Sequence, residues 1–411
     1  MDIHDTAISD LIAAETTRQR EGLEMIASEN YPNRTVLNAL GSIASAKYAE
    51  GYPGKRYYAG NEIIDKIEQL AIDRAKKLFG AEHVNVQPYS GSPSNLAVYV
   101  GLLELGDTIM GLSLTHGGHL THGHKVSFTG KAFNAVQYEV NADTGLIDYR
   151  AVAALARAAK PKLIISGTTA YPRIVDWQKM QAISQEVGAL HMVDMSHVAG
   201  LVAAGVVPNP VPYADVVTTT THKTLRGPRG AMILCKAEHA KAIDRAVFPG
   251  LQGGPHENTI AAIAVALHQA AQPDFKEYGR QVVANARALA EHLQKDFGYK
   301  LVSGGTDTHL LLVDLTNKGI SGSQAEDALS RVSITVNKNT IPGETRSPMD
   351  PSGIRIGLAA LTSRGVVQGD MQKIADWINT ALSGDSASEL DQVRGEVQSF
   401  AKGLPLPGVD S

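Results

Sequence analysis

The residues best suited to chemistry form one basic, threonine-rich stretch at 218–230, which reads TTTTHKTLRGPRG. It follows an apolar run, and its lysine, histidine and arginines are poor material for a packed core. Lys223 could form a Schiff base with an aldehyde cofactor, because neighbouring cations lower the pKa of its amine. The threonine hydroxyls and Arg229 are suited to binding a phosphate. The composition also fits a solvated basic loop after an edge strand, and the stretch alone leaves both interpretations open.

Asp194 favours the chemical interpretation. It ends the run LHMVD at 190–194, so it puts a carboxylate at the C-terminal end of a core strand. Pyridoxal 5′-phosphate (PLP) needs a carboxylate beside its pyridine nitrogen, which keeps that nitrogen protonated. The separation of 29 residues between Asp194 and Lys223 suits one crossover unit between neighbouring strands. The alternative is that Asp194 only caps the next helix, as aspartates commonly do.

A phosphate site is indicated by Ser90, Gly91 and Ser92, which lie between a predicted strand and a predicted helix. Their amides and hydroxyls would face an anion at the N-terminus of that helix. Ser-Gly-Ser also makes ordinary turns, so this signal is weak when taken alone.

Four histidines occur within HGGHLTHGH at 116–124, which raises the question of a zinc site. The glycines disfavour a rigid helical face of ligands, and neither a cysteine nor a nearby carboxylate completes a set. An imidazole stacked on a flat cofactor suits a loop after a strand better. We therefore predict no metal.

The predicted elements place these residues at one edge of a sheet. Short apolar runs alternate with helical stretches, which favours an α/β fold with a mostly parallel central sheet covered on both faces. Such sheets carry their sites at the C-terminal ends of the strands. The predicted strands are 83–88, 108–112, 132–140, 163–166, 190–194, 215–219 and 231–235, and helices are predicted at 93–103, 149–159 and 177–187.

The flanking segments predict two further parts of the chain. Helices are expected at 6–21 and 62–79, and a buried helix at 259–271 precedes a boundary near Pro273. A long amphipathic helix follows, and then strands 309–314, 334–337 and 353–357 mix with helices 324–331, 371–382 and 389–400. We therefore expect an N-terminal arm (1–72), a large α/β domain (73–272) and a smaller C-terminal α+β domain (273–411).

The composition is that of a globular protein, with 43% hydrophobic and 19% charged residues among 411. A net charge of −4 gives no general attraction to nucleic acid or to an anionic membrane. The one cysteine, Cys235, is expected to be a buried apolar residue, in keeping with a reducing compartment. We predict a cytoplasmic protein, because no signal-peptide pattern and no run of about 20 apolar residues is present.

The longest motifs of the chain resemble the serine hydroxymethyltransferase family of PLP enzymes. The resemblance runs from about Met25 to Arg364 and rests on IASENY (26–31), KYAEGYPGKRYYAG (47–60), HGGHLTHG (116–123), VDMSHVAGLVAAG (193–205), TTTTHKTLRGPRG (218–230) and ITVNKN (334–339). It implies fold type I, the aspartate aminotransferase-like architecture. It also implies reversible transfer of the serine hydroxymethyl carbon to tetrahydrofolate, which gives glycine and 5,10-methylenetetrahydrofolate.

The resemblance also implies a role for each residue of the cofactor site. Lys223 would hold PLP, Asp194 would pair with the pyridine nitrogen, and His119 would stack on the ring. The cofactor's phenolic oxygen would lie near His197 and Thr169. The phosphate would be bound by Ser90, Gly91, Ser92 and His222, with Tyr48, Gly253 and Gly254 supplied by a second subunit.

The implied substrates are serine, glycine and tetrahydrofolate, and the implied assembly is a homodimer with shared active sites. Arg355 would pair with the substrate carboxylate, helped by Ser28. Glu50 and Tyr58 would come from the neighbouring subunit, and Glu50 would manage the proton of the substrate hydroxyl. The positions that match folate contacts are Leu114, Gly118, Leu120 and Asn339.

Several positions depart from the family pattern without removing a group that the chemistry needs. They are Pro93-Ser94, Thr169, Ser196, Glu257-Asn258 and Leu358-Ala359. They leave open an α-methylserine enzyme or a folate-independent threonine-type aldolase, since one methyl group at Cα is worth only ~1–3 kcal/mol of discrimination. A catalytically silent protein of the same fold is disfavoured, because Lys223, Asp194 and Arg355 are all present.

Overall fold

The computed structural model describes residues 5–384 and 386–410, and the chain divides into two compact units. Unit 1 comprises Met1–Tyr31 and Gln281–Ser411, and unit 2 comprises Pro32–Arg280. The division falls inside α11 (Pro273–Lys295), whose first residue is the expected boundary position. The expected arm at 1–72 contributes residues to both units.

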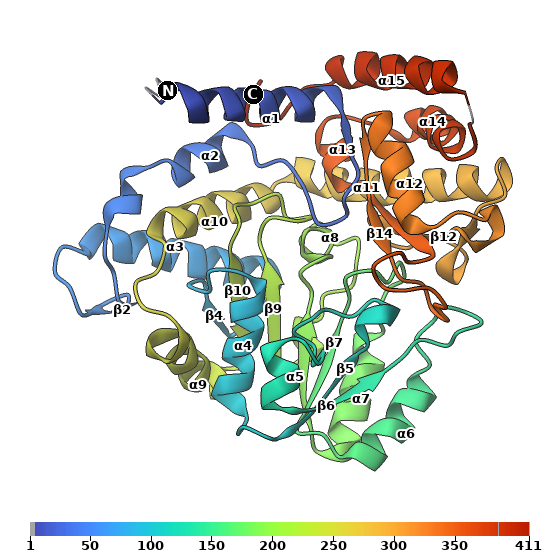
Figure 1. The fold of residues 1–411 in the computed structure, drawn as a ribbon. Coiled ribbons are helices and arrows are strands. Elements are labelled where there is room, and N and C mark those ends of the chain that lie inside the picture. Colours follow the sequence, from blue (N-terminus) through green and yellow to red (C-terminus); the bar gives the residue numbers. More distant parts are fainter. Residues whose placement is uncertain (1–4, 385, 411) are drawn as a thin grey trace. The chain divides into compact units, whose positions relative to one another are not determined.

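Unit 2 is built on a seven-stranded sheet (Figure 1). The strand order is β4-β10-β9-β8-β7-β5-β6, and β10 runs antiparallel to both of its neighbours while the other pairs are parallel. Every residue of β7, β9 and β10 is buried, as expected for strands covered on both faces. The strands are β4 (His83–Asn85), β5 (Thr108–Leu112), β6 (Asn134–Tyr138), β7 (Leu163–Gly167), β8 (Leu190–Asp194), β9 (Val216–Thr220) and β10 (Ala231–Cys235).

Capping residues fix the ends of several helices of unit 2. Asp148 caps one helix by accepting hydrogen bonds from two backbone amides of its first turn, and Gly80 ends another in the left-handed conformation, with φ 74°. α4 packs on β9 and β10, whereas α7 packs on β7 and β8. The helices are α2 (Arg34–Leu40), α3 (Glu62–Phe79), α4 (Gly91–Leu102), α5 (Phe128–Ala132), α6 (Tyr149–Ala159), α7 (Trp177–Val187), α8 (Ala199–Ala203), α9 (Ala240–Arg245) and α10 (Glu257–Ala270).

Unit 1 has its own sheet and core. The sheet is antiparallel, with the order β11-β12-β15-β14, while β1 and β13 form a separate parallel pair. Apolar side chains of its helices and strands form one core cluster. The elements are α1 (Thr6–Glu21), β1 (Leu23–Glu24), β11 (Lys300–Leu301), β12 (Leu310–Asp314), α12 (Gly322–Arg331), β13 (Ile334–Thr335), β14 (Asn337–Asn339), β15 (Gly353–Gly357), α13 (Ala359–Ser363), α14 (Met371–Ser383) and α15 (Ala387–Lys402).

Most predicted elements are confirmed, and a few bounds are wrong. The predicted strand 334–337 is two strands that belong to different sheets, and residues 86–88 lie outside β4. Residue 132 ends a helix instead of starting a strand. Cys235 is buried as expected. Within the described ranges, no helix has the length and apolar composition that a bilayer span requires.

Candidate active site

The candidate site of unit 2 begins where two neighbouring parallel strands end. Asp194, the last residue of β8, pairs in register with Thr218 of β9, and Lys223 follows the end of β9. The hydroxyl of Thr224 donates to the carbonyl of His197 at 2.9 Å and accepts from the amide of Gly200 at 3.0 Å. These bonds join the loop after β9 to the turn after β8, so the predicted lysine and carboxylate share one edge of the sheet.

Asp194 is buried and well supplied with hydrogen-bond donors. Its Oδ2 accepts from Asn95 Nδ2 at 2.9 Å and from His122 Nε2 at 3.1 Å, and its Oδ1 accepts from the amide of Ser196 at 3.1 Å. Burial alone would raise the pKa of Asp194, but the hydrogen bond and charge of His122 outweigh it and hold the pKa well below its usual value. The side chain is therefore an ionised carboxylate, as a pyridine nitrogen requires.

Asn95 is a residue of this site that the sequence analysis missed. Its amide nitrogen also donates to Thr121 Oγ1 at 2.8 Å, and its amide oxygen accepts from Thr218 Oγ1 at 2.6 Å. The side chain is fully enclosed and joins α4, the histidine loop, β8 and β9. The one signal in the sequence is a polar residue among the apolar positions of α4.

His119 lies beside this carboxylate with a neutral ring. Its Nδ1 is 2.7 Å from Thr121 Oγ1 and accepts from the Thr121 amide at 3.2 Å. Burial, reinforced by nearby His122, lowers the pKa of His119 to about 4. A neutral, partly buried imidazole suits the predicted stacking on a flat ring.

The structure corrects one premise of the metal argument. No carboxylate near the histidines in sequence completes a ligand set, but Asp194 does so in space. Ligand atoms of His119, His122 and Asp194 lie within 4.8 Å of one another. His119 Nδ1, His122 Nε2 and Asp194 Oδ2 each already take part in a hydrogen bond within the protein. The absence of a metal stays a prediction.

The predicted phosphate loop contacts the end of β9. Ser90 precedes α4, and a Cβ on Gly91 would lie 2.7 Å from Thr220 Cγ2, so a larger residue there would force Thr220 to shift. Two buried polar atoms, Thr220 Oγ1 and His222 Nδ1, have no hydrogen-bond partner among the residues described. Burial, together with the charge of Lys223, lowers the pKa of His222 to about 3. Because unpaired buried polar groups are costly, a phosphate at the start of α4 fits this set.

A second cluster in unit 2 contains the residues that the resemblance assigns to the active site of a neighbouring subunit. They are Tyr48, Glu50, Tyr58, Gly253 and Gly254. A Cβ on Gly253 would lie 3.1 Å from Glu50 Oε1, and one on Gly254 would lie 3.3 Å from the ring of Tyr48. The rings of Tyr48 and Tyr58 meet edge to face at 5.2 Å. One subunit therefore presents all five together, as joint donation requires.

Three positions predicted to contact folate lie in the segment after β5, and Thr169, which follows β7, contacts that segment. Thr169 Oγ1 donates to the carbonyl of Gly118 at 2.8 Å, so its hydroxyl proton is used within the protein. A Cβ on Gly118 would overlap the carbonyl of Leu112 at 1.9 Å, which leaves no room for a side chain. In the same segment, Leu114 begins a short helical turn and Leu120 is 42% exposed.

Three predicted site residues belong to unit 1. Arg355 lies on β15, where its Nε donates to Asn337 Oδ1 at 3.0 Å, and burial lowers its pKa to about 10. A carboxylate ligand would offset that desolvation. Ser28 follows Ala27, whose backbone contacts Gly357 at the end of the same strand. Asn339 ends β14, the strand next to β15.

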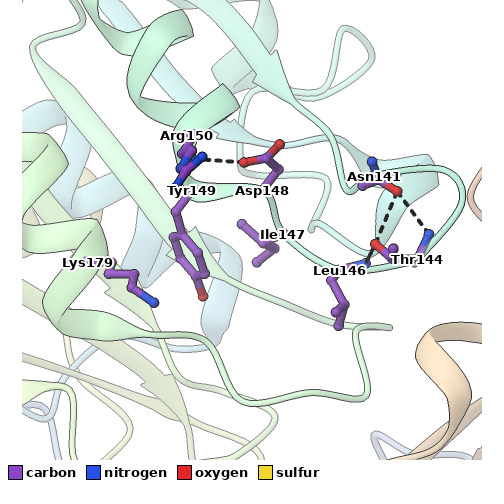
Figure 2. A pocket seen from close by; sticks show the side chains of 8 residues that line it. All are labelled: Asn141, Thr144, Leu146, Ile147, Asp148, Tyr149, Arg150 and Lys179. Carbon is purple, nitrogen blue, oxygen red and sulfur yellow. Dashed lines mark hydrogen bonds between the residues drawn. The ribbon is translucent and has the colours of Figure 1, made fainter.

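A surface pocket of about 490 Å³ on unit 2 lies apart from these residues (Figure 2). Its lining comes from the turn at 141–150 and from Lys179 of α7. The turn is held by its own hydrogen bonds, such as that from the Thr144 amide to Asn141 Oδ1 at 2.9 Å. None of the predicted site residues lines this pocket.

Comparison with known proteins gives a consistent family assignment. A family profile described as serine hydroxymethyltransferase matches residues 1–378. A serine hydroxymethyltransferase of Desulfotalea psychrophila is 56% identical over 407 residues, which cover 99% of this chain and 95% of the relative. That of Acidobacterium capsulatum is 56% identical over 98% of this chain and 95% of its own length, and that of Acidothermus cellulolyticus is 54% identical over 99% and 96%. The chain belongs to the serine hydroxymethyltransferase family.

Proposed function

We propose that this protein catalyses reversible transfer of the serine hydroxymethyl carbon to tetrahydrofolate, which gives glycine and 5,10-methylenetetrahydrofolate. The observation that carries the proposal is the buried, ionised Asp194 at the end of β8 beside the loop that holds Lys223. The family uses PLP as cofactor and tetrahydrofolate as co-substrate. PLP, when bound, supplies the electron sink for cleavage of a bond at the substrate Cα.

The residues of unit 2 would hold and polarise the cofactor. Lys223 Nζ would bind it covalently, and Asp194, kept ionised by His122 and Asn95, would hold a proton on the pyridine nitrogen. The neutral ring of His119 would stack on the cofactor without adding charge. The phosphate would satisfy the buried polar atoms at the end of β9, with Ser90, Gly91 and Ser92 around it.

The substrate would be held and deprotonated by residues on other elements. Arg355 would bind the serine carboxylate through its planar guanidinium, with Ser28 close to the end of the same strand. Glu50 would take the proton of the substrate hydroxyl as the bond from Cα to the hydroxymethyl carbon breaks. The released one-carbon unit would then pass to tetrahydrofolate beside Leu114, Gly118, Leu120 and Asn339.

We further propose a homodimer with shared sites that works in the cytoplasm. The cluster of Tyr48, Glu50, Tyr58, Gly253 and Gly254 supports joint donation to a neighbour, because these residues already contact one another. The single cysteine supports a reducing compartment. Cell fractionation tests the location.

Three of the departures from the family pattern, Ser196, Leu358 and Pro93, do not favour another substrate. The hydroxyl of Ser196 accepts from the amide of Thr220 at 3.0 Å, and Leu358 belongs to the core cluster of unit 1. Pro93 lies in the first turn of α4, where a missing N–H costs little. The places of these residues in the fold therefore explain them without a change of substrate. Whether the enzyme cleaves α-methylserine or threonine is decided by the assay that follows.

The test measures glycine formed from serine by the purified holoenzyme, with and without tetrahydrofolate. We expect folate-dependent glycine formation and a cofactor absorbance band that Lys223→Ala abolishes. Lys241→Ala, which removes an exposed lysine of α9, is the matched control. It should keep the folate-dependent glycine formation and the absorbance band. Equal glycine formation without folate, or faster cleavage of α-methylserine or threonine, would contradict the proposal in favour of the aldolase-type alternative.

A further inference from the structure

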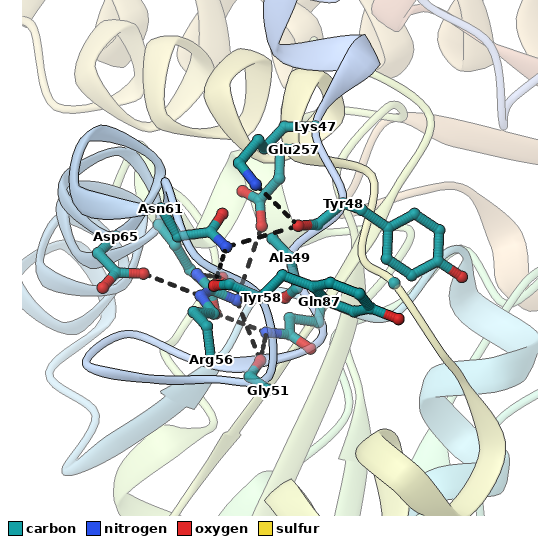
Figure 3. Close-up of polar contacts among 12 residues, drawn as sticks. Lys47, Tyr48, Ala49, Gly51, Arg56, Tyr58, Asn61, Asp65, Gln87 and Glu257 are labelled. Atoms are coloured by element: carbon teal, nitrogen blue, oxygen red, sulfur yellow. Dashed lines mark hydrogen bonds and ion pairs between the residues drawn. The ribbon is translucent and has the colours of Figure 1, made fainter.

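A buried ionic cluster surrounds Arg56, which belongs to β3 (Lys55–Arg56) and has a side chain only 3% exposed (Figure 3). Its Nε donates to Asp65 Oδ1 at 2.8 Å, and its Nη2 donates to Glu68 Oε2 at 2.7 Å. Both carboxylates come from α3, and Glu68 is fully enclosed. Two carboxylates therefore already accept from the one guanidinium.

The same guanidinium holds the backbone on both sides of Glu50. Arg56 Nη1 donates to the carbonyl of Ala49 at 2.7 Å and to that of Gly51 at 3.0 Å. Gln87 Nε2 donates to the Gly51 carbonyl as well, at 2.9 Å. The position of the Glu50 backbone therefore depends on where Nη1 points.

Glu257 is a third carboxyl group in this cluster, and one of the positions where the chain departs from the family pattern. It begins α10, is 1% exposed, and has one oxygen 3.7 Å from Arg56 Nη1, which is too far for a hydrogen bond. Neither of its oxygens finds a hydrogen-bond partner among residues 5–384 and 386–410. A buried carboxylate without donors is strongly disfavoured, whereas the neutral acid is tolerated.

The surroundings of Glu257 support the neutral form. Burial and the charge of Glu68 raise its pKa to about 8. Lys47 is near, but its ammonium already donates to the carbonyls of Tyr48 and Ala59. α2 also packs on α10 and presents apolar side chains such as Val36 to it. The charged groups that act on Glu257 are Glu68 and Asp65 of α3, Arg56 of β3, and Lys47.

We propose that Glu257 is a pH-sensitive positioning residue for Glu50. As a neutral acid it leaves Arg56 Nη1 on the carbonyls of Ala49 and Gly51. When its proton passes to water at higher pH, the carboxylate competes for Nη1, because a charged acceptor binds a guanidinium more strongly than a carbonyl does. The backbone at Glu50 then loosens and turnover falls. This inference rests on the role of Glu50 in the proposed function.

The test compares turnover at pH 7 and pH 9 in wild type and E257Q, with serine and tetrahydrofolate saturating. Gln keeps the size of the side chain but cannot ionise. We expect wild-type turnover to fall up to about tenfold more than that of E257Q, because a group that titrates near pH 8 is about nine-tenths neutral at pH 7 and only about one-tenth neutral at pH 9. Glu277→Gln, which removes an exposed carboxylate paired with Arg280, should keep the wild-type ratio.

A second measurement does not depend on activity. Infrared difference spectra of the holoenzyme, wild type minus E257Q, should show a protonated carboxyl band at pH 7 that disappears by pH 9. The subtraction is needed because burial also raises the pKa of Glu24 and of Glu68. Equal pH ratios in wild type and E257Q would overturn the inference, as would the absence of this band. If E257Q does not fold, Glu257→Met, which also cannot ionise, replaces it in both measurements. A wild type that forms no glycine with folate, but shows the band, would instead overturn the proposed function.

Discussion

At the scale of single residues, the charge of Asp194 depends on donors from distant parts of the chain. Asn95 lies 99 residues before it and His122 lies 72 residues before it, yet both donate to the same carboxylate oxygen. A buried carboxylate that loses donors takes up a proton more readily. These two side chains therefore determine whether Asp194 can keep the pyridine nitrogen protonated.

Replacing Asn95 by alanine should lower turnover about 10–100-fold, the usual cost of losing a group that orients a primary ligand. The variant leaves Thr218 Oγ1 without its acceptor and Asp194 Oδ2 with one donor fewer. Steady-state kinetics across pH would check this, since an acid limb that moves to higher pH would report the raised pKa of Asp194. Asn134→Ala removes an exposed asparagine that donates to Thr108 and should change neither quantity.

The main pair of the site could be predicted from the sequence, whereas its supporting residues could not. Asp194 and Lys223 flank consecutive apolar runs, and such runs form neighbouring strands in an alternating chain. Asn95 carries no local mark of its partners, because these come from strands and loops that only the folded chain brings to α4. His122 stood within the histidine motif, but nothing near it in sequence points to Asp194.

At the scale of elements, Arg364 joins three segments of unit 1. It follows the last residue of α13, is fully buried, and donates to five backbone carbonyls. These acceptors lie at the end of α1, at the end of α15 and in the segment after α15, and they are Gln19, Arg20, Gly22, Ala401 and Pro405. Helix ends leave carbonyls unpaired, so one planar guanidinium satisfies several of them at once.

Arg364→Lys should destabilise unit 1 by about 3 kcal/mol, because an ammonium has three donors for five carbonyls and leaves buried acceptors unpaired. Urea unfolding, followed by fluorescence of Trp377 in α14 in a Trp177→Phe background, would measure the change. Arg346→Lys is the matched control, since Arg346 is 45% exposed and pairs with Asp350 on the surface. That control should shift the free energy of unfolding by less than about 0.5 kcal/mol.

Local patterns predicted the bounds of regular elements but not their pairing. Helices 6–21, 62–79, 149–159 and 177–187 follow from periodicity and end residues, both of which are local signals. Residues 334–337 alternate like one strand, yet β13 pairs with β1 while β14, which begins at Asn337, pairs with β15. Pairing depends on which edges are available after folding, and the alternation does not encode this.

At the scale of the whole molecule, the chain has the fold type I architecture of its family. In unit 2, the mostly parallel sheet presents Asp194 and the loop of Lys223 at one edge. The same unit carries a second set around Glu50 that has no evident role toward its own Lys223 in the proposed function. If that set serves a neighbouring subunit, each complete site contains residues of two chains.

Shared sites predict that two inactive variants restore activity together. Lys223→Ala removes the cofactor anchor, and Glu50→Gln removes the proton acceptor that would be donated to the neighbour. In a mixed dimer, one site receives an intact lysine from one chain and an intact glutamate from the other. Random pairing should therefore recover about a quarter of wild-type turnover, because half of the dimers are mixed and half of their sites are complete.

A control distinguishes active sites shared between subunits from an effect of mixing two variants. Lys223→Ala and Asp194→Asn alter residues that belong to the same subunit's part of the site, joined through β8 and β9. A mixed dimer of these two variants contains no complete site, so it should stay inactive. Co-expression with two different affinity tags isolates each mixed dimer for assay. The purified dimer of Lys223→Ala with Glu50→Gln should then recover about half of wild-type turnover, in place of the quarter expected from random pairing. Failure of Lys223→Ala with Glu50→Gln to exceed this control would mean that Glu50 acts within its own subunit or not at all.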